Sequence, residues 1–284
     1  MEIRPIRPED VPEVESLLSA ADSERVLSEA KARRLGSAGG WVAQSVGGRI
    51  TAVAQTASHI TPSEDVVTGV EIVTPPSADQ LFLAMCERVT EEIEGHVEVW
   101  AIDPDQSAVL RRQGWIPGRV LLRLDIDLPL EGPVDLPDLY RLVAYRPQDE
   151  RAFVNANNRA FARHADNSHL TMEEFEARQK LPWFDTGDVL IAKVGDDIAG
   201  FCWTKKHDDA GEIYIIGVTP DHRGKGLGQS LLRAGLAHLV ERYGFSRGFL
   251  YSDADNDAAL HVYEALGFAE ASRRWVYIRP GDET

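Results

Sequence analysis

A segment rich in glycine and positive charge follows the apolar run IYIIGV. It reads RGKGLG over 223–228, with three glycines at alternate positions, and a helix-like stretch comes next. Glycines let backbone N–H groups approach a phosphate closely, and a following helix adds its first N–H groups and the positive end of its dipole. A plain strand–turn–helix junction needs neither three glycines nor two cations. The segment therefore predicts a phosphate-binding loop.

Three kinds of phosphate loop compete for this segment. A dinucleotide-binding G-x-G-x-x-G fails, because the third glycine position after Gly226 and Gly228 is Leu231. A P-loop requires Gly-Lys followed by Ser or Thr, whereas Gly226 follows Lys225. The third pattern, Arg/Gln-x-x-Gly-x-Gly, is satisfied from Arg223 to Gly228. That pattern favours a pyrophosphate lying on the backbone of the loop.

Hydrophobic periodicity and turn residues predict the elements that position this loop. Strands are expected at 141–145, 188–194, 198–206, 211–218, 247–252 and 273–279, and helices at 149–163, 172–180, 226–243 and 256–266. Thr171 and Glu174 form a capping-box pattern at the start of one helix. Mixed strands with interposed helices predict an α/β (α+β) layer structure.

The chain repeats this plan in its two halves. Arg7-Pro8 before an expected helix is echoed by Arg146-Pro147, and VLRRQGW at 109–115 is echoed by VYEALGF at 262–268. Proline at a helix start is tolerated because its missing N–H has no helical partner there. The sequence thus predicts two tandem domains.

A proline-bearing segment separates the two halves. DLPLEGPVDLPDL at 127–139 has three prolines and no apolar period, which is typical of a linker. We therefore expect a first domain at 1–127, a Pro-rich linker at 128–139 and a second domain at 140–284.

Composition narrows the class of partner. The formal net charge of -16 argues against nucleic acid, which is bound by basic faces. No apolar run approaches the roughly 20 residues of a membrane helix, and the start has no apolar core of a secretion signal. Cys86 and Cys202 lie far apart, and the histidines show no ligand spacing, so no metal is expected. We expect a cytoplasmic monomer acting on a small molecule.

The glycine loop, preceded by EIYIIGVTP and followed by DNDAALHVYEALGF, strongly resembles the GNAT superfamily of N-acetyltransferases. The resemblance implies tandem GNAT-type domains and acetyl-CoA as co-substrate, with its pyrophosphate on the loop and its pantetheine arm along strand 211–218. The implied cofactor-binding residues are Ile216, Gly217, Val218, Arg223, Gly224, Lys225, Gly226, Leu227, Gly228, Gln229 and Asn256.

Further segments narrow the resemblance. NRAFARHADN, PWFD, GFCWTKKH and LYSDADN are similar to the mycothiol synthases, a family of two-domain GNAT proteins. That resemblance implies acetylation of the cysteinyl amine of a cysteine–glucosamine–inositol conjugate, the last step of mycothiol biosynthesis. The implied acceptor-binding residues are Glu24, Asp166, Lys205, Glu212 and Tyr251. Two departures concern the acceptor: Asp166 is shorter than the glutamate expected there, and YSDADN replaces the usual YVEADN.

Acetyl transfer to an amine needs a base, a polarised carbonyl and an acid for the leaving thiolate. The resemblance assigns Glu212 as the general base and Tyr263 as the acid, while the backbone N–H of Val218 is expected to polarise the carbonyl. By the two-residue period of a strand, Glu212 should share a face with Tyr214, Ile216 and Val218.

The first half lacks these features. After GVEIVTPP it reads SADQLFLAMCERV, with no glycine between Gly69 and Gly95, and Leu110 stands where the second half has Tyr263. We therefore expect a degenerate, non-catalytic first domain that does not bind acetyl-CoA. Two alternatives to the function above stay open. One is an acetyltransferase for another amine, such as an aminoglycoside, a polyamine or a protein N-terminus, and the other is a non-catalytic acetyl-CoA-binding pseudoenzyme.

Overall fold

The structure, a computed structural model, describes residues 1–21, 27, 29–32, 34–36, 39–60, 66–162 and 170–282. The chain forms two compact units. The first comprises Met1–Leu121, Asp253–Asp255 and Ser272–Thr284, and the second comprises Leu122–Ser252 and Asn256–Ala271. The end of the chain therefore belongs to the unit formed by its beginning.

The first unit is built on a sheet of order β1-β2-β3-β4-β5-β12. Its strands are β1 (Glu2–Pro5), β2 (Gly40–Gln44), β3 (Ile50–Ile60), β4 (Val66–Val73), β5 (His96–Ala101) and, from Ser272 onward, β12 (Ala269–Ile278). Its helices are α1 (Val11–Ala20), α2 (Glu29–Ala32), α3 (Asp79–Thr90) and α4 (Pro104–Arg112). β4 and β5 are parallel, and the other recorded pairs in this unit are antiparallel.

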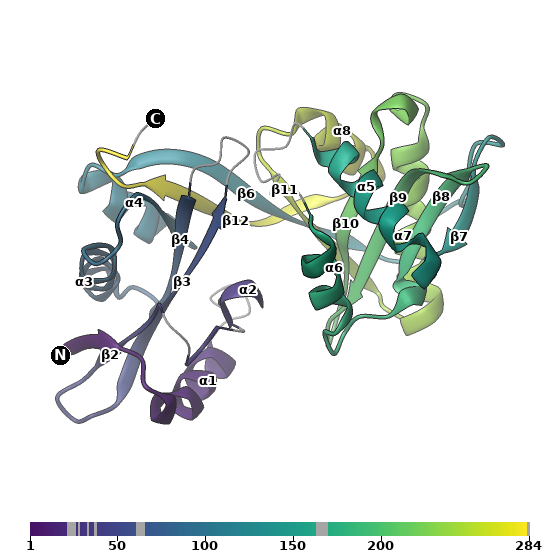
Figure 1. Ribbon diagram of the computed structural model, residues 1–284. Helices are drawn as coiled ribbons and strands as arrows, with labels where there is room; N and C mark the ends of the chain where they lie inside the picture. Colours follow the sequence, from purple (N-terminus) through teal and green to yellow (C-terminus); the bar gives the residue numbers. More distant parts are fainter. Residues whose placement is uncertain are drawn as a thin grey trace. The chain divides into compact units, whose positions relative to one another are not determined.

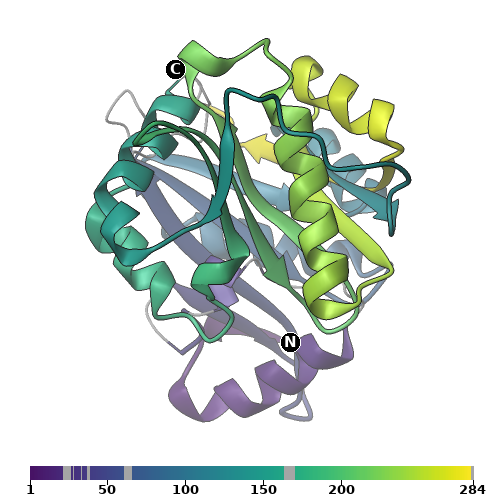
Figure 2. The ribbon, with the colours of Figure 1, turned by 90° about the vertical axis from the view of Figure 1, so that its right-hand side faces the viewer.

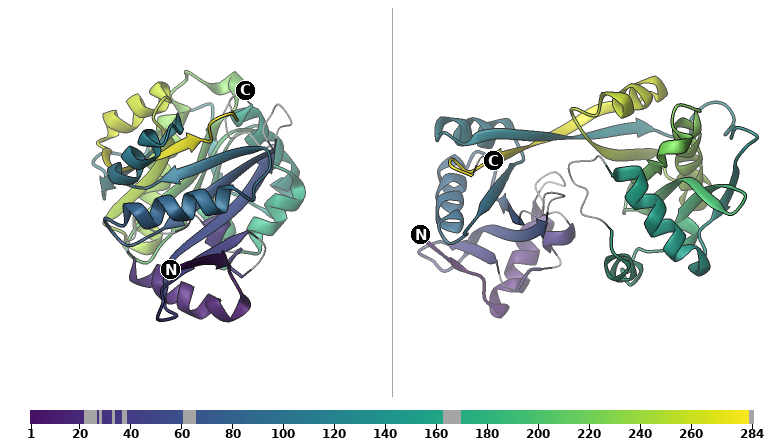
Figure 3. Two further views of the ribbon diagram at one scale, coloured as in Figure 1. Left: turned by 90° about the vertical axis from the view of Figure 1, so that its left-hand side faces the viewer. Right: turned by 45° about the horizontal axis from the view of Figure 1, so that its top comes forward.

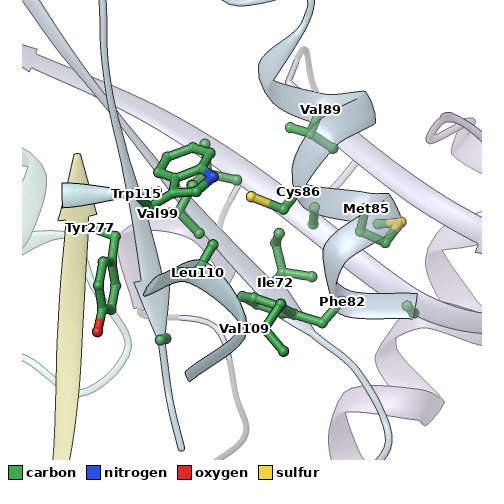
Figure 4. Close-up of a cluster of buried hydrophobic side chains, with 14 of the residues drawn as sticks. Ile72, Phe82, Met85, Cys86, Val89, Val99, Val109, Leu110, Trp115 and Tyr277 are labelled. Carbon is green, nitrogen blue, oxygen red and sulfur yellow. The ribbon is translucent and has the colours of Figure 1, made fainter. Parts of the chain in front are cut away.

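Helix α3 forms the core of the first unit, lying across its strands in Figure 3 (left). Phe82, Met85, Cys86 and Val89 recur at helical spacing and are fully buried. Figure 4 shows them facing Ile72 and Leu110, with Tyr277 of β12 at the edge of the cluster. Burial raises the pKa of the Cys86 thiol to about 12, so this cysteine is an inert core residue.

The second unit has a sheet of order β6-β11-β10-β9-β8-β7. Its strands are β7 (Arg141–Ala144), β8 (Val189–Val194), β9 (Asp197–Lys206), β10 (Gly211–Val218), β11 (Arg247–Asp253) and the second half of β6 (Ile116–Asp127), whose first half belongs to the first unit. Its helices are α5 (Glu150–Phe161), α6 (Met172–Gln179), α7 (Leu227–Tyr243) and α8 (Asp257–Leu266). Each strand and helix expected in the second half is present with small shifts at its ends, and the α/β fold class is confirmed (Figure 1).

Helices cover both faces of the second sheet. On one face, Phe153 of α5 and Phe175 of α6 stack at 5.0 Å between ring centroids and meet Trp203 of β9. The expected capping box starts α6, because Thr171 Oγ1 accepts from the Glu174 N–H at 3.1 Å and Glu174 Oε2 accepts from the Thr171 N–H at 3.0 Å. On the other face lies α7, seen along the sheet in Figure 2.

The proline-bearing segment between β6 and β7 is fastened to α7. The Arg233 guanidinium donates to the carbonyls of Glu131 and Pro133. At the end of the segment, the Tyr140 hydroxyl lies 3.2 Å from His222 Nδ1, next to the glycine loop. Among the described residues, the helices are too short or too polar to cross a membrane.

Candidate active site

Strand β10 contains an irregularity at its centre. Its antiparallel register with β9 pairs Ile213 with Thr204 and then shifts, so that Ile215 pairs with Trp203. Tyr214 is therefore an extra residue on β10, which is the definition of a β-bulge. A bulge inverts the alternation of side chains for the rest of the strand.

The bulge corrects the predicted face of Glu212. Residues directly opposite in a pair share a face, so Glu212 lies on the side of Lys205, together with Tyr214, whose ring packs 5.3 Å from that of Trp203. Ile216 and Val218 instead pair with Cys202 and Gly200 on the α7 side of the sheet. The expectation that all four side chains share one face was wrong for these two, because it assumed an unbroken two-residue period.

The bulge also marks the place where β10 leaves β11. The parallel register of these strands pairs Gly211–Ile213 with Gly248–Leu250. Both strands are described in full, and beyond Ile213 they form no further pair. The Thr219 N–H donates to the carbonyl of Ala199. Because successive N–H groups of a strand point to alternate sides, the N–H groups of Val218 and Ile216 point away from β9. They face the side where pairing with β11 has ended.

The glycine loop connects β10 to α7. Gly224 and Gly226 have φ of 69° and 79°, in the region that favours glycine. Gly226 is the N-cap of α7, and no side chain caps this helix end. The first N–H groups of a helix have no partner within it, so those of Leu227, Gly228 and Gln229 are available to an anion. The predicted loop residues are thus brought together at one helix terminus.

The two cations of the loop bind backbone carbonyls. Arg223 donates to the carbonyl of Val218 at 3.2 Å and to that of Ala160 at 2.5 Å. Lys225 Nζ donates to the carbonyl of Asp221 at 2.8 Å. Arg223 therefore ties the end of β10 to the end of α5, so it orders the loop as well as adding charge beside it.

Glu212 has a partner that the sequence analysis did not identify. Its Oε2 lies 2.7 Å from Nε2 of His207, across the β9–β10 hairpin. The Glu212 side chain is buried at 9% exposure, whereas that of His207 is 36% exposed. The hairpin itself was a usable signal, since residues flanking a tight turn are cross-strand neighbours.

Lys205 lies among aromatic rings rather than on Glu212. Its ammonium is 4.6 Å from the ring centroid of Trp183 and 5.5 Å from that of Tyr214. These distances are those of cation–π contacts. Trp183, which precedes β8, belongs to the PWFD motif, and its contact with Lys205 does not follow from that motif. Its ring centroid lies 5.0 Å from that of Tyr214 in an edge-on arrangement, on the face of the sheet that carries Glu212.

Tyr263 lies buried on α8, 8% exposed and 5.7 Å between ring centroids from Phe268. Burial, with a smaller contribution from Cys202, raises its pKa to about 12. The phenol is therefore protonated at neutral pH, as an acid must be. Among the described residues, no side chain makes a recorded hydrogen bond to its hydroxyl.

The remaining predicted residues are distributed as follows. Asn256 is the N-cap of α8, and its carbonyl accepts from the N–H groups of Ala259 and Leu260 at 3.0 Å. Tyr251 on β11 is exposed and lies 5.9 Å from Phe249 between ring centroids. Glu24 and Asp166 lie outside the described residues. Over the parts of the chain that are described, no three His, Cys, Asp or Glu residues gather as a metal site would require.

The first unit offers a contrast at the equivalent strands. β4 ends in Val73-Thr74-Pro75 as β10 ends in Val218-Thr219-Pro220. Its register with β3 runs without a shift, and its parallel pairing with β5 continues from Val67 to Glu71. Glu71, which corresponds to Ile216, forms a buried ion pair with Lys31 at 3.0 Å. Over its described length, β4 thus has neither the bulge of β10 nor the early end of parallel pairing.

Comparisons with known proteins agree with this geometry. Residues 153–268 match the Acetyltransferase (GNAT) family. The mycothiol acetyltransferase of Salinispora arenicola is 37% identical over 225 residues, covering 75% of this chain and 73% of the relative. That of Geodermatophilus obscurus is 34% identical over 272 residues, covering 88% and 87%. The chain belongs to the mycothiol acetyltransferase family. It is an N-acetyltransferase, as its sequence predicted.

Solved structures with the same fold include a tandem GNAT protein. A GCN5-related N-acetyltransferase from Sphaerobacter thermophilus aligns with a TM-score of 0.76 at 21% identity, covering 98% of this chain and 95% of that one. A tandem GNAT protein from the clavulanic acid biosynthesis pathway aligns with a TM-score of 0.68 at 17% identity, covering 98% and 97%. At these identities the likeness concerns the fold, and the tandem GNAT architecture is confirmed.

Proposed function

We propose that this mycothiol acetyltransferase family member transfers acetyl from acetyl-CoA to the cysteinyl amine of a cysteine–glucosamine–inositol conjugate, using the second unit alone. The single observation that carries the proposal is the conjunction at β10. The buried carboxylate of Glu212, the bulge at Tyr214 and the outward N–H groups of Ile216 and Val218 follow one another along one strand.

The second unit fits acetyl-CoA at two places. The uncapped start of α7 supplies N–H donors and a positive dipole end for a pyrophosphate. Along β10, the N–H groups of Ile216 and Val218 point to the side where pairing with β11 has ended, and there they can bind the amide groups of a pantetheine arm. Asn256 lies at the start of α8, immediately after the loop that follows β11.

The second unit supplies a residue for each chemical step of acetyl transfer. Bound acetyl-CoA supplies an activated acetyl group and a thiolate leaving group. Glu212 takes the proton of the attacking amine, directly or through one water. The Val218 N–H donates to the carbonyl oxygen of the acetyl group as negative charge develops there. Tyr263 donates its phenolic proton to the departing sulfur, and its raised pKa keeps that proton available.

The acceptor lies on the face of the sheet that carries Glu212. Trp183 and Tyr214 offer flat apolar rings next to Lys205, a combination that suits a sugar-like acceptor with many hydroxyls. Tyr251 on β11 is exposed and can add its hydroxyl to this surface. We place the acceptor roles of Lys205, Glu212 and Tyr251 here.

The first unit takes no acetyl-CoA in this proposal. Its β4 and β5 stay paired where β10 and β11 part, and the buried Lys31–Glu71 pair occupies the corresponding strand position. Placing a pantetheine arm between β4 and β5 would cost the backbone hydrogen bonds that pair these strands. The loop after β4 has no Arg/Gln-x-x-Gly-x-Gly pattern to offset that cost.

The acceptor assignment is tested by a panel of amines. Release of coenzyme A thiol is measured with the cysteine–glucosamine–inositol conjugate beside an aminoglycoside, a polyamine and a peptide N-terminus. We expect the conjugate to be preferred over the other amines by at least 100-fold in kcat/KM. A stronger preference for another amine would replace the acceptor while leaving acetyl transfer in place. Binding of acetyl-CoA with no thiol release from any amine would indicate a pseudoenzyme.

A further inference from the structure

His207 is the residue beside the proposed base that no motif assigns. Its Nε2 lies 2.7 Å from Oε2 of Glu212, well within hydrogen-bond distance. An ionised carboxylate can only accept, so the hydrogen of this bond is on Nε2 of the imidazole. His207 therefore donates to one of the two oxygens of Glu212.

The His207 side chain is fixed by its backbone and by one aromatic neighbour. The backbone N–H of His207 donates to the carbonyl of Ala210 at 3.0 Å, which closes the hairpin. Its ring lies 5.1 Å from that of Phe249 on β11. Phe249 in turn has the Arg123 guanidinium 4.3 Å from its ring centroid. The Nε2–H donor of His207 therefore belongs to the β9–β10 hairpin and packs against Phe249 of the neighbouring strand β11.

Lys205 does not compete for this position. It is paired in register with Glu212, but its ammonium is directed onto the rings of Trp183 and Tyr214. The contact recorded for the Glu212 carboxylate among the described residues is therefore the one from His207.

We propose that His207 is a positioning residue, whose Nε2–H holds Oε2 of Glu212 so that Oε1 faces the attacking amine. This inference rests on the proposed role of Glu212 as base. Holding one oxygen fixes the rotation of the carboxyl group, and misplacement of a reacting group by about 1 Å can cost 100-fold in rate. His207 itself takes no proton from the acceptor in this arrangement.

The test uses three substitutions at one position in the full chain. Gln can present an N–H near the place of imidazole Nε2, whereas Asn is one methylene shorter and Ala has no donor. We expect His207→Gln to keep kcat within about threefold of wild type. His207→Asn and His207→Ala should lower kcat by about 10-fold to 100-fold, with KM for acetyl-CoA and the thermal unfolding midpoint unchanged.

Two controls separate this inference from the proposed function. Glu212→Gln alone reports on the base, and His207→Ala added to Glu212→Gln should lower kcat no further. If Glu212→Gln abolishes turnover while His207→Ala keeps wild-type kcat, the positioning role is wrong and the base stands. Equal losses in the Gln and Ala variants of His207 would also overturn it, because donor geometry would then be irrelevant. Full activity of Glu212→Gln would overturn the base and the positioning role together.

Discussion

Glu212 and Lys205 stand opposite each other on adjacent strands, yet their charged groups are bound by different neighbours. The carboxylate meets His207 at 2.7 Å, and the ammonium lies over Trp183 at 4.6 Å. A direct ion pair with Lys205 would favour the charged form of Glu212 and so make it a weaker base. Separate partners let the carboxylate and the cation act on an acceptor independently of each other.

Lys205 should contribute to binding of the acceptor without affecting the binding of acetyl-CoA. We expect Lys205→Met to raise KM for the conjugate by about 10-fold, in the range of a lost charge-assisted hydrogen bond. The matched control is Lys206→Met, because Lys206 is exposed and its ammonium lies by Tyr243, at 5.7 Å from the ring. Steady-state kinetics with each substrate varied in turn provide the measurement. Equal effects of the two substitutions would argue against an acceptor contact.

The two glycines at the start of α7 should respond differently to a methyl group. Gly226 has φ of 79°, and L-residues are destabilised by about 1–2 kcal/mol in that region. A Cβ on Gly228 would stand 3.6 Å from Val218 Cγ2, an ordinary contact. We therefore expect Gly226→Ala to weaken acetyl-CoA binding by about 10-fold and Gly228→Ala by less than threefold. Calorimetric titration measures both, and the reverse order would show that close approach of the backbone at Gly228 matters more than the left-handed backbone at Gly226.

The chain should bind one acetyl-CoA. β4 and β5, both described in full, remain paired from Val67 to Glu71, so the opening between β10 and β11 has no counterpart between these two strands. Titration calorimetry should give a stoichiometry of one for the wild type. Gly226→Ala should weaken that single event without exposing a second one. A stoichiometry of two would show that the first unit binds the cofactor despite its continuous pairing.

Tyr263 should act as an acid over an unusually wide pH range. Burial raises its pKa to about 12, so its proton is retained well above pH 10, where an ordinary tyrosine loses half of it. We expect Tyr263→Phe to lower kcat by about 100-fold, the contribution typical of general acid catalysis. In the wild type, turnover should show no decline attributable to this group between about pH 9 and pH 10.5. A fall centred near pH 10 that is absent from Tyr263→Phe would contradict the raised pKa.

The sequence was informative where a local rule sufficed. Helix starts followed from Thr171 with Glu174, and the loop from its glycine spacing, because capping and left-handed backbone depend on neighbouring residues alone. The departures arise from pairing between strands. Nothing in EIYIIGV reveals that Tyr214 is the extra residue, since a bulge is defined by the register with β9. Assuming an unbroken period therefore put Ile216 and Val218 on the wrong face.

Two further features depend on the folded chain. The contact of His207 with Glu212 requires the β9–β10 hairpin, although the residues flanking the turn could have suggested it. The packing of Tyr277 against α4, where its hydroxyl lies 2.7 Å from Ser107 Oγ, joins residues far apart in the sequence. A chain read in order gives no reason to place its last strand with its first half.

The role of Glu212 as the base is tested most directly by comparing the turnover of the cysteine–glucosamine–inositol conjugate by wild type and by Glu212→Gln. Coenzyme A release is followed at saturating acetyl-CoA, and acetyl-CoA affinity is measured for both proteins. Glu212→Gln is expected to turn over the conjugate at least about 100-fold more slowly than wild type, with acetyl-CoA affinity unchanged. Turnover of the conjugate by Glu212→Gln at the wild-type rate would contradict the assignment of the active site to this carboxylate.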